Sequence, residues 1–408
     1  MADGAGAPCG GASRGAPGRR VLAHNRIEKI EAYVLGIIEG RRTGAGSAVA
    51  RGALYGLSHV YRGLVQFRLA LFRLGIFRPH ALGCQVLSVG NLTVGGTGKT
   101  PIVEALAREL QRRGRRVAIL SRGYKKAQPS LGTRLRDALP LGRRRPPPPV
   151  VSDGRRLLLD SAMGGDEPFM LASNLPEVAV IVGEDRVRSG RYAIKDLGCD
   201  TLILDDGFHY LSLKHRLDIV LVDRTNPFGN RHLLPRGILR EPLRNIRRAG
   251  FIFITKSNGD GAADLRRQLR QLNPHAEISE CRHCPRYLQD VFTRQRLELS
   301  TLRGLDAAAI SGIAAPRSFE DELVRLGARV LYHKRYTDHH RYTQQEIIDV
   351  INRGLSRGAK AVITTEKDAV RFPMMERLDL PVYFLRVEIE MLSGAEAFHD
   401  WISRICFR

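Results

Sequence analysis

The sequence predicts an α/β protein in which a parallel-sheet domain follows an N-terminal amphipathic helix and precedes a second, smaller α/β domain. Three observations support this fold class. Short apolar runs rich in β-branched residues alternate with helix-like segments, as buried parallel strands and their crossover helices do. A glycine-rich loop joins the first of these runs to a helical segment. A longer stretch with helical periodicity comes before the first run and ends near Pro79.

The N-terminal part of the chain divides into two segments. Residues 1–27 are rich in Gly, Ala and Pro and predict a disordered leader, with an organelle transit peptide as a minor alternative. Residues 28–80 predict a basic amphipathic helical segment, because Arg51, Arg62 and Arg73 fall within about 40° of one another on a helix. A broad apolar face lies elsewhere on it and comprises Leu54, Leu57, Tyr61, Leu64, Leu71 and Phe72. Such a helix either lies in a membrane interface or packs on its own domain, and the pattern leaves both interpretations open.

The two α/β domains follow in order. Residues 81–246 are expected to form the larger one, with residues 125–150 as a solvated Pro/Arg-rich insertion. Its predicted strands are Val86–Val89, Val117–Leu120, Val178–Val182, Leu202–Leu204 and Ile219–Val222. Residues 247–408 are expected to form the smaller one, with the boundary near Arg244–Gly250. Its predicted strands are Phe251–Thr255, Val330–Tyr332, Ala361–Thr364 and Val382–Leu385.

Composition narrows the class of protein. The 408 residues are 43% hydrophobic and 26% charged, which is ordinary for a globular chain and excludes a collagen or a wholly disordered protein. The 65 Lys and Arg against 42 Asp and Glu leave a net charge of +23, which favours a nucleic acid, an anionic lipid or a phosphorylated ligand as partner. Six Cys do not make a disulfide framework in a chain of this length and indicate a reducing compartment. Charged residues interrupt every apolar stretch before it reaches the ~18 residues of a spanning helix.

The strongest motif is the loop Ser88–Pro101, which lies between a predicted strand and a predicted helix, as a phosphate-binding loop requires. Its glycines let successive N–H groups point at one phosphate, Lys99 can reach the β/γ oxygens and the Thr100 hydroxyl can ligate Mg²⁺. The common pattern has Gly where this chain has Thr93, and a chance glycine-rich turn is the alternative. This motif predicts a P-loop NTPase-like domain. The expected nucleotide-binding residues are Thr93, Val94, Gly95, Gly96, Thr97, Gly98, Lys99 and Thr100.

Two carboxylates follow a predicted strand directly, in Leu202–Tyr210. Ligands of α/β sheets bind at the carboxyl ends of the strands, and Mg²⁺ prefers oxygen ligands. Asp205 and Asp206 are therefore predicted metal ligands together with Thr100, the alternative being an acidic turn that opens a loop.

Taken together, these segments resemble the tetraacyldisaccharide 4'-kinase family, whose members phosphorylate an acylated glucosamine disaccharide in lipid A biosynthesis. The resemblance covers roughly residues 50–395 and includes the Thr93 deviation. It runs in the family's order through Ser88–Pro101, Ser121–Tyr124, Gly165–Pro168, Val182–Arg186, Leu204–His209, Leu233–Pro242, Asp338–His340 and Thr365–Asp368.

The resemblance implies an activity and roles for particular residues. It implies transfer of the γ-phosphate of ATP, with Mg²⁺, to the 4'-hydroxyl of a tetraacyldisaccharide 1-phosphate, giving lipid IVA. Asp166 matches the catalytic acid, which would take the proton of that hydroxyl, and His339 matches its dyad partner, with His340 as the neighbouring alternative. Supporting positions are Tyr124, Glu167, Arg186 and Glu241. The acceptor implies an anionic membrane surface as a partner and a peripheral location on the cytoplasmic face of the bacterial inner membrane, while the oligomeric state is left open.

Two departures from the family pattern are the long insertion before Val150 and His209–Tyr210, where Gln-His is common. Two other motifs stay without an assigned role. Cys281-Arg-His-Cys284 has metal-like spacing but no second Cys pair, and Thr364–Asp368 at a strand end is either functional or brackets a loop.

Two rival functions are a partitioning or metal-insertase ATPase and a nucleic-acid-binding protein. The first type of protein carries a signature Lys early in the loop, where this chain has Thr93–Val94. The second is poorly supported, since aromatics make up only 6% of the chain, no basic platform with interleaved aromatics is present and no nucleic-acid partner is expected.

Overall fold

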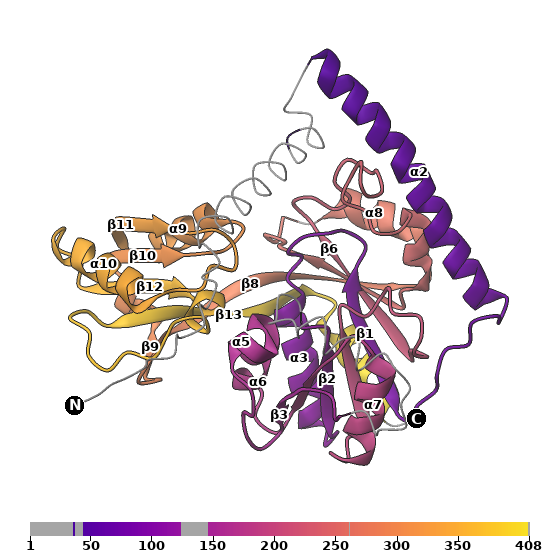
Figure 1. The fold of residues 1–408 in the computed structure, drawn as a ribbon, viewed down its shortest axis with the longest axis horizontal. Coiled ribbons are helices and arrows are strands. Elements are labelled where there is room, and N and C mark those ends of the chain that lie inside the picture. Colours follow the sequence, from indigo (N-terminus) through magenta and orange to yellow (C-terminus); the bar gives the residue numbers. More distant parts are fainter. Residues whose placement is uncertain (1–35, 37–43, 124–145, 261, 407–408) are drawn as a thin grey trace, which may run out of the picture.

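The computed structural model describes residues 36, 44–123, 146–260 and 262–406. The predicted leader, most of the insertion and Tyr124 lie outside these ranges. One continuous sheet of thirteen strands runs through both lobes of the molecule (Figure 1). The strand order is β11-β10-β12-β13-β8-β7-β6-β1-β5-β2-β4-β3, and β9 pairs with β8 off this path.

The bounds of the strands are β1 (Gln85–Asn91), β2 (Val117–Ser121), β3 (Val150–Asp153), β4 (Ala179–Val182), β5 (Thr201–Asp205), β6 (Leu217–Asp223), β7 (Phe251–Thr255), β8 (Glu277–Asp290), β9 (Arg296–Glu298), β10 (Asp306–Ser311), β11 (Arg329–Arg335), β12 (Ala361–Thr365) and β13 (Val382–Ser393). The α-helices are α2 (Ala45–Arg73), α3 (Lys99–Arg112), α5 (Ser161–Gly164), α6 (Asp166–Asn174), α7 (Arg186–Lys195), α8 (Ala263–Leu272), α9 (Pro316–Arg325), α10 (Gln344–Leu355), α11 (Glu366–Ala369) and α12 (Ala395–Cys406). Two 3₁₀ helices are η1 (Leu243–Arg248) and η2 (Leu299–Leu302).

The larger lobe is the predicted parallel α/β domain. Its central strands β7, β6, β1, β5, β2 and β4 are parallel neighbours. Alternate side chains of these strands face opposite sides of the sheet, and the strands are buried on both. Helices α3, α6 and α12 pack on one face, and α7 and α8 pack on the other. Because parallel strands end together, the carboxyl ends of β1 and β5 lie at the same edge, where the site is built.

The smaller lobe has its own two cores, one on each face of β10, β12 and the first half of β13, with α10 on one face and α9 on the other. Two long antiparallel strands, β8 and β13, pair over most of their length and connect the lobes (Figure 1). The chain thus passes into the smaller lobe along β8 and returns along β13.

All nine predicted strands are confirmed, although the packing of the chain after residue 246 differs from a simple two-part division. Phe251 of β7 and Phe398 of α12 both lie in the core of the larger lobe. We therefore propose that the smaller lobe comprises residues 291–381, the second half of β8 and the first half of β13, instead of the whole of residues 247–408. The predicted insertion also ends earlier, because Val150 is already the first residue of β3.

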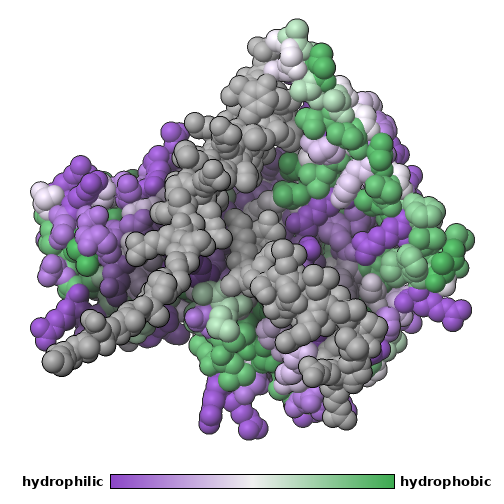
Figure 2. Space-filling view, in the orientation of Figure 1, coloured by the Kyte–Doolittle hydropathy of each residue, from purple (hydrophilic) through white to green (hydrophobic). Residues whose placement is uncertain are grey.

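Helix α2 is the described part of the predicted amphipathic segment. It leans on the larger lobe through one side only: the Tyr61 hydroxyl donates to the Arg240 carbonyl oxygen (3.0 Å), and Arg244 donates to Gln66 (2.8 Å). Its other side is exposed and apolar, and Figure 2 shows hydrophobic side chains gathered along it. The exposed apolar residues of α2 are Val49, Tyr55, Leu57, Val60, Leu64 and Phe67. Among the described residues, no helix combines the length and the apolar character needed to cross a bilayer.

The place of α12 in the larger core can be tested by unfolding. The Phe398 ring packs edge-on against the rings of Phe251 (5.7 Å) and Phe253 (5.4 Å). Phe398→Ala should lower the free energy of unfolding by about 3–5 kcal/mol in urea titrations, because a buried ring is replaced by a cavity. Phe67→Ala, which truncates an exposed ring on α2, is the matched control and should change stability little. Equal effects of the two substitutions would contradict this packing.

Candidate active site

The phosphate-binding loop lies between β1 and α3, as predicted. Gly95 (φ 122°) and Gly98 (φ 79°) adopt backbone conformations that favour glycine. There is also no room for a side chain at Gly98, because a Cβ there would lie 2.7 Å from His283 Nε2. The loop is fixed from outside, since the Val94 N–H donates to the Ile238 carbonyl oxygen (2.7 Å) and Thr255 Oγ1 donates to the Thr97 carbonyl oxygen (2.9 Å). Thr93 is buried and pairs with Leu239, so the position without glycine serves as a bridge to the neighbouring loop.

Lys99 and Thr100 are the first two residues of α3, at the helix end where backbone N–H groups are unpaired and favour anions. The Lys99 ammonium lies 3.6 Å from Asp206 Oδ1 and 3.4 Å from Asn91 Oδ1. The predicted phosphate-binding and acidic motifs are thus brought together. A lysine held between two oxygen acceptors is positioned for a phosphate that enters from the loop.

Asp205 is the last residue of β5 and Asp206 follows it, and the pKa values of the two carboxyls are shifted in opposite directions. Asp205 is buried and accepts a hydrogen bond from Ser121 Oγ (3.0 Å), and its burial raises its pKa to about 6. Burial also opposes the charge of Asp206, yet Lys99 and Arg240 together lower the pKa of that carboxyl to about 2. The Arg240 guanidinium donates to Asp206 Oδ2 at 2.7 Å. Asp206 has a positive φ of 55°, a strained conformation of the kind that clusters at functional sites.

The acidic pair and Thr100 fit a magnesium ion by chemistry. Their donors are all oxygens, and buried Asp206 Oδ1 accepts no hydrogen bond from the described residues. The described residues form no cluster of three or more His, Cys, Asp and Glu side chains that would hold a metal alone. Mg²⁺ commonly binds to one or two carboxylates and completes its shell with phosphate and water.

Two of the predicted supporting residues, Arg186 and Glu241, form hydrogen bonds that hold the backbone and side chains around the phosphate-binding loop and the acidic pair. Arg186 donates to the backbone carbonyl oxygens of Asp205 (2.7 Å) and Asp206 (3.0 Å), and so fixes the strained turn. Glu241 lies 2.6 Å from His209 Nδ1, whose ring also reaches the Asn91 carbonyl oxygen through Nε2 (2.9 Å). The departure at His209 therefore forms part of the support for the end of β1. Tyr124 lies outside the described residues.

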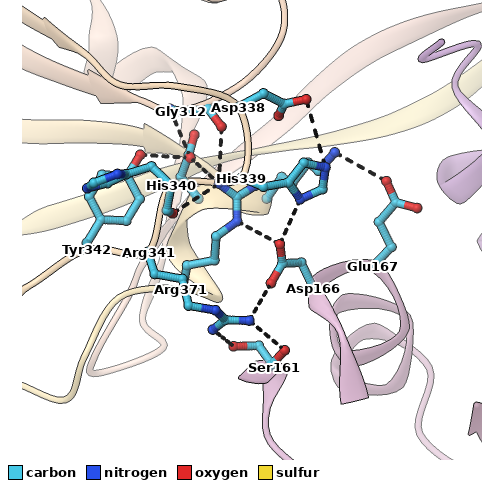
Figure 3. Close-up of polar contacts among 12 residues, drawn as sticks. Ser161, Asp166, Glu167, Gly312, Asp338, His339, His340, Arg341, Tyr342 and Arg371 are labelled. Carbon is cyan, nitrogen blue, oxygen red and sulfur yellow. Dashed lines mark hydrogen bonds and ion pairs between the residues drawn. The ribbon is translucent and has the colours of Figure 1, made fainter. Parts of the chain in front are cut away.

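The second half of the site begins at Asp166, the first residue of α6. Gly165 precedes it with φ 94°, which turns the chain sharply between α5 and α6. His339 comes from the smaller lobe, and its Nδ1 lies 3.0 Å from Asp166 Oδ2 (Figure 3). His339 also has a positive φ of 64°. His340, the neighbouring alternative, points elsewhere: it bonds Glu346 (3.0 Å) and stacks on Tyr336.

Two arginines of the smaller lobe complete the surroundings of Asp166. Arg371 Nε lies 3.0 Å from Asp166 Oδ2, and Arg341 Nη2 lies 3.2 Å from Oδ1 (Figure 3). Burial alone would raise the pKa of Asp166, but the His339 hydrogen bond and the charges of Arg371 and Arg341 lower it below the usual range. The carboxyl is therefore ionised at neutral pH. Beside it, Glu167 pairs with Lys367 (3.2 Å).

Several residues of the site had no signal in the sequence. Arg240 belongs to a segment that was singled out for resemblance, yet its contact with Asp206 was not predicted. Arg341 and Arg371 stood outside every motif, among the many arginines of a strongly basic chain. Only the position of Arg341 directly after Asp338–His340 could have drawn attention to it.

Comparisons with known proteins agree with the sequence and the geometry. Residues 50–406 match the family model described as tetraacyldisaccharide-1-P 4'-kinase. A relative from Anaeromyxobacter sp. (strain K), named tetraacyldisaccharide 4'-kinase, is 41% identical over 366 residues, which are 87% of this chain and 90% of the relative. A relative of the same name from Halothermothrix orenii is 33% identical over 391 residues, 91% of this chain and 97% of the relative.

A solved structure agrees as well. The crystal structure of LpxK from Aquifex aeolicus in complex with ATP matches with a TM-score of 0.68 and 28% identity, over 88% of this chain and all of that one. The fold predicted from the sequence is therefore confirmed. On the length of these matches, this chain belongs to the tetraacyldisaccharide-1-P 4'-kinase family.

Proposed function

We propose that this protein transfers the γ-phosphate of ATP to the 4'-hydroxyl of a tetraacyldisaccharide 1-phosphate, a step of lipid A biosynthesis that yields lipid IVA. The names of its relatives and the ATP complex of its structural neighbour support this activity. The observation that carries it is the pairing of two half-sites: a phosphate-binding loop in the larger lobe, and a buried carboxylate that a histidine of the smaller lobe contacts. The family match does not favour either rival function.

The nucleotide half-site binds and neutralises the triphosphate. The N–H groups of the loop and the start of α3 face the phosphates, and Lys99 adds a charge. Thr100, Asp205 and Asp206 would hold Mg²⁺, which neutralises charge on the transferring phosphoryl group when it is bound. Lys99 would then exchange its contact with Asp206 for one with a phosphate oxygen.

The acceptor half-site orients the sugar hydroxyl and receives its proton. Asp166 is ionised, so it can accept a hydrogen bond from the 4'-hydroxyl and take the proton as the oxygen attacks phosphorus. A weakly basic carboxylate is sufficient here, because little charge develops on the attacking oxygen in a loose transition state. His339 holds one oxygen of Asp166 and thereby directs the other toward the acceptor.

The roles of the two residues can be tested by substitution. Asp166→Asn and His339→Ala should each lower kcat by roughly 10²-fold or more, which is within the range for loss of general base catalysis. The measurement is formation of the bis-phosphorylated lipid from Mg²⁺–ATP and the tetraacylated disaccharide 1-phosphate in detergent. His340→Gln is the matched control, because His340 contacts Glu346 and not Asp166. Near-wild-type turnover in Asp166→Asn or His339→Ala would remove that residue from the mechanism.

We further propose that α2 docks the protein on an anionic membrane. The acceptor carries acyl chains and resides in a bilayer, so the enzyme must reach the interface. The exposed side of α2 combines Leu57, Leu64 and Phe67 with the exposed Arg68, a composition suited to contact with acyl chains and lipid phosphates. Its inner side contacts Arg240 next to Glu241, which connects the docking helix to the active site. The ATP requirement favours the cytoplasmic face of the inner membrane.

If α2 docks on the membrane, acidic side chains introduced on its exposed apolar face should weaken binding to anionic lipid vesicles. The double variant Leu64→Glu/Phe67→Glu should lose binding to anionic lipid vesicles in flotation assays, because two carboxylates replace exposed apolar contacts and oppose the surface charge. Its thermal unfolding should stay close to wild type, since both side chains are largely exposed. Leu355→Glu, at an exposed leucine of α10, is the matched control and should still bind. Retained vesicle binding by the double variant would defeat the proposal.

A further inference from the structure

Thr365–Asp368, the last residue of β12 and the first three residues of α11, had no assigned role in the sequence. In the structure it lies at the boundary between the lobes, against α6 of the larger lobe. Each of its charged side chains contacts α6 or a residue that holds α6. We call Thr365–Arg371, which continues this segment by one turn, the clamp segment.

The first half of the clamp segment contacts both ends of α6. Glu366 accepts a hydrogen bond from Asn174 at the end of α6 (2.6 Å), and Arg386 Nη1 of β13 donates to both of its carboxylate oxygens (2.7 and 2.8 Å). Arg386 is buried and also pairs with Glu104 of α3, the helix that begins at the phosphate-binding loop. Lys367 pairs with Glu167 at the start of α6 (3.2 Å). The contacts fix the position of α6 relative to β13 and α3.

The second half of the clamp segment reaches the Asp166 carboxylate. Asp368 is wholly buried and accepts four hydrogen bonds, from the Gly312 N–H (3.0 Å), the Tyr342 hydroxyl (2.8 Å), Arg371 Nη1 (3.1 Å) and the Thr365 hydroxyl (2.5 Å). The Arg371 side chain has no exposure, and its Nε lies 3.0 Å from Asp166 Oδ2 (Figure 3). A chain of contacts thus runs from the backbone of the smaller lobe to the proposed base.

Stability alone does not explain a buried arginine at this place. Removing a guanidinium from water is costly, and buried ion pairs often stabilise no better than apolar residues of similar size. The Arg371 Nε and Nη2 groups are both buried and make no hydrogen bond within the described residues, so the contact of Nε with Asp166 is an ion pair and the desolvation of this cation is only partly offset. What Arg371 does provide is a second fixed contact on Oδ2, the oxygen that also contacts His339.

We propose that Arg371, held in place by Asp368 and Tyr342, is a positioning residue that fixes the Asp166 carboxylate toward the acceptor hydroxyl. Two contacts on Oδ2 prevent rotation of the carboxylate and leave Oδ1 as the oxygen directed at the acceptor. Arg341, which contacts Oδ1, is half-exposed and can yield to substrate. This inference rests on the proposed function, because it assigns a task to Arg371 only if Asp166 receives the proton.

The proposal predicts a loss of turnover without a loss of nucleotide binding. Arg371→Gln should lower kcat for lipid phosphorylation by roughly 10²-fold, since small misplacement of a reacting group has effects of this size. The KM for ATP should stay near wild type, because the polar partners of Arg371 among the described residues (Gly312, His340, Asp368 and Asp166) lie outside the nucleotide half-site. Arg371→Lys, which retains the charge, should recover part of the lost turnover. Arg377→Gln, at an exposed arginine six residues on, is the matched control and should behave as wild type.

A double-variant comparison separates positioning from a general structural effect. Arg371→Gln should reduce the residual kcat of Asp166→Asn by less than about 3-fold, because residues that act through one group are not additive. Tyr342→Phe, which keeps the packed ring and removes one hydrogen bond to Asp368, provides a milder variant that should fold and lose part of kcat. A full effect of Arg371→Gln in the Asp166→Asn background, or wild-type kcat in both Arg371→Gln and Tyr342→Phe, would overturn the proposal.

The two proposals can fail separately. Wild-type protein that makes no lipid product, or Asp166→Asn that turns over normally, contradicts the proposed function. If Asp166→Asn lowers kcat for lipid phosphorylation and Arg371→Gln does not, only the positioning role of Arg371 is contradicted.

Discussion

The structure depends on one contact across the lobe boundary, the hydrogen bond between Asp166 and His339. These residues are 173 positions apart in the chain and come from different lobes. Burial of the carboxylate opposes its charge, and His339, Arg371 and Arg341 of the smaller lobe more than offset this effect, so that its pKa lies below the usual range. The chemical state of the proposed base is therefore a property of the assembled lobes and not of the larger lobe alone.

The fold explains how such a contact is held. One sheet passes through both lobes, and β8 and β13 cross the boundary together as an antiparallel pair. Arg386 on β13 pairs with Glu104 on α3 and Glu366 of the clamp segment, which links the helix of the phosphate-binding loop to the acceptor side. A change in the relative position of the lobes would alter both half-sites at once. The buried polar network at this boundary thus favours a particular arrangement of the lobes more than it adds stability.

The sequence predicted those features that short-range pattern determines. The buried parallel strands, the loop that ends in Lys99–Thr100 and the acidic pair after β5 each have a local signature, and all were located correctly. Strand β10 was missed because its Asp-Ala-Ala-Ala-Ile-Ser sequence has few β-branched residues, and its burial comes from α9 and α10 packed on either face. Strand β8 was missed because charged residues and Pro285 interrupt its apolar positions.

Less of the active site than of the fold could be predicted from the sequence. The pairing of Asp166 with His339 was inferred from family resemblance, since no periodicity connects residues so distant in the chain. The contacts of Arg371 and Arg240 could not be predicted, because the chain has 65 Lys and Arg and pattern alone does not distinguish a buried arginine from a solvated one. Likewise, the return of α12 to the first core depends on tertiary packing of a helix that looks like an ordinary amphipathic C-terminal element.

The central claim is that the two half-sites hold ATP and the sugar hydroxyl face to face, with Asp166 receiving a proton and forming no bond to phosphorus. The stereochemistry of transfer tests this most directly. With ATP made chiral at the γ-phosphorus by oxygen isotopes, the account predicts a lipid product phosphorylated at the 4' position with inverted configuration, because one in-line displacement inverts the centre. Retained configuration would reveal two successive displacements through a phosphorylated side chain and would contradict direct transfer between the half-sites.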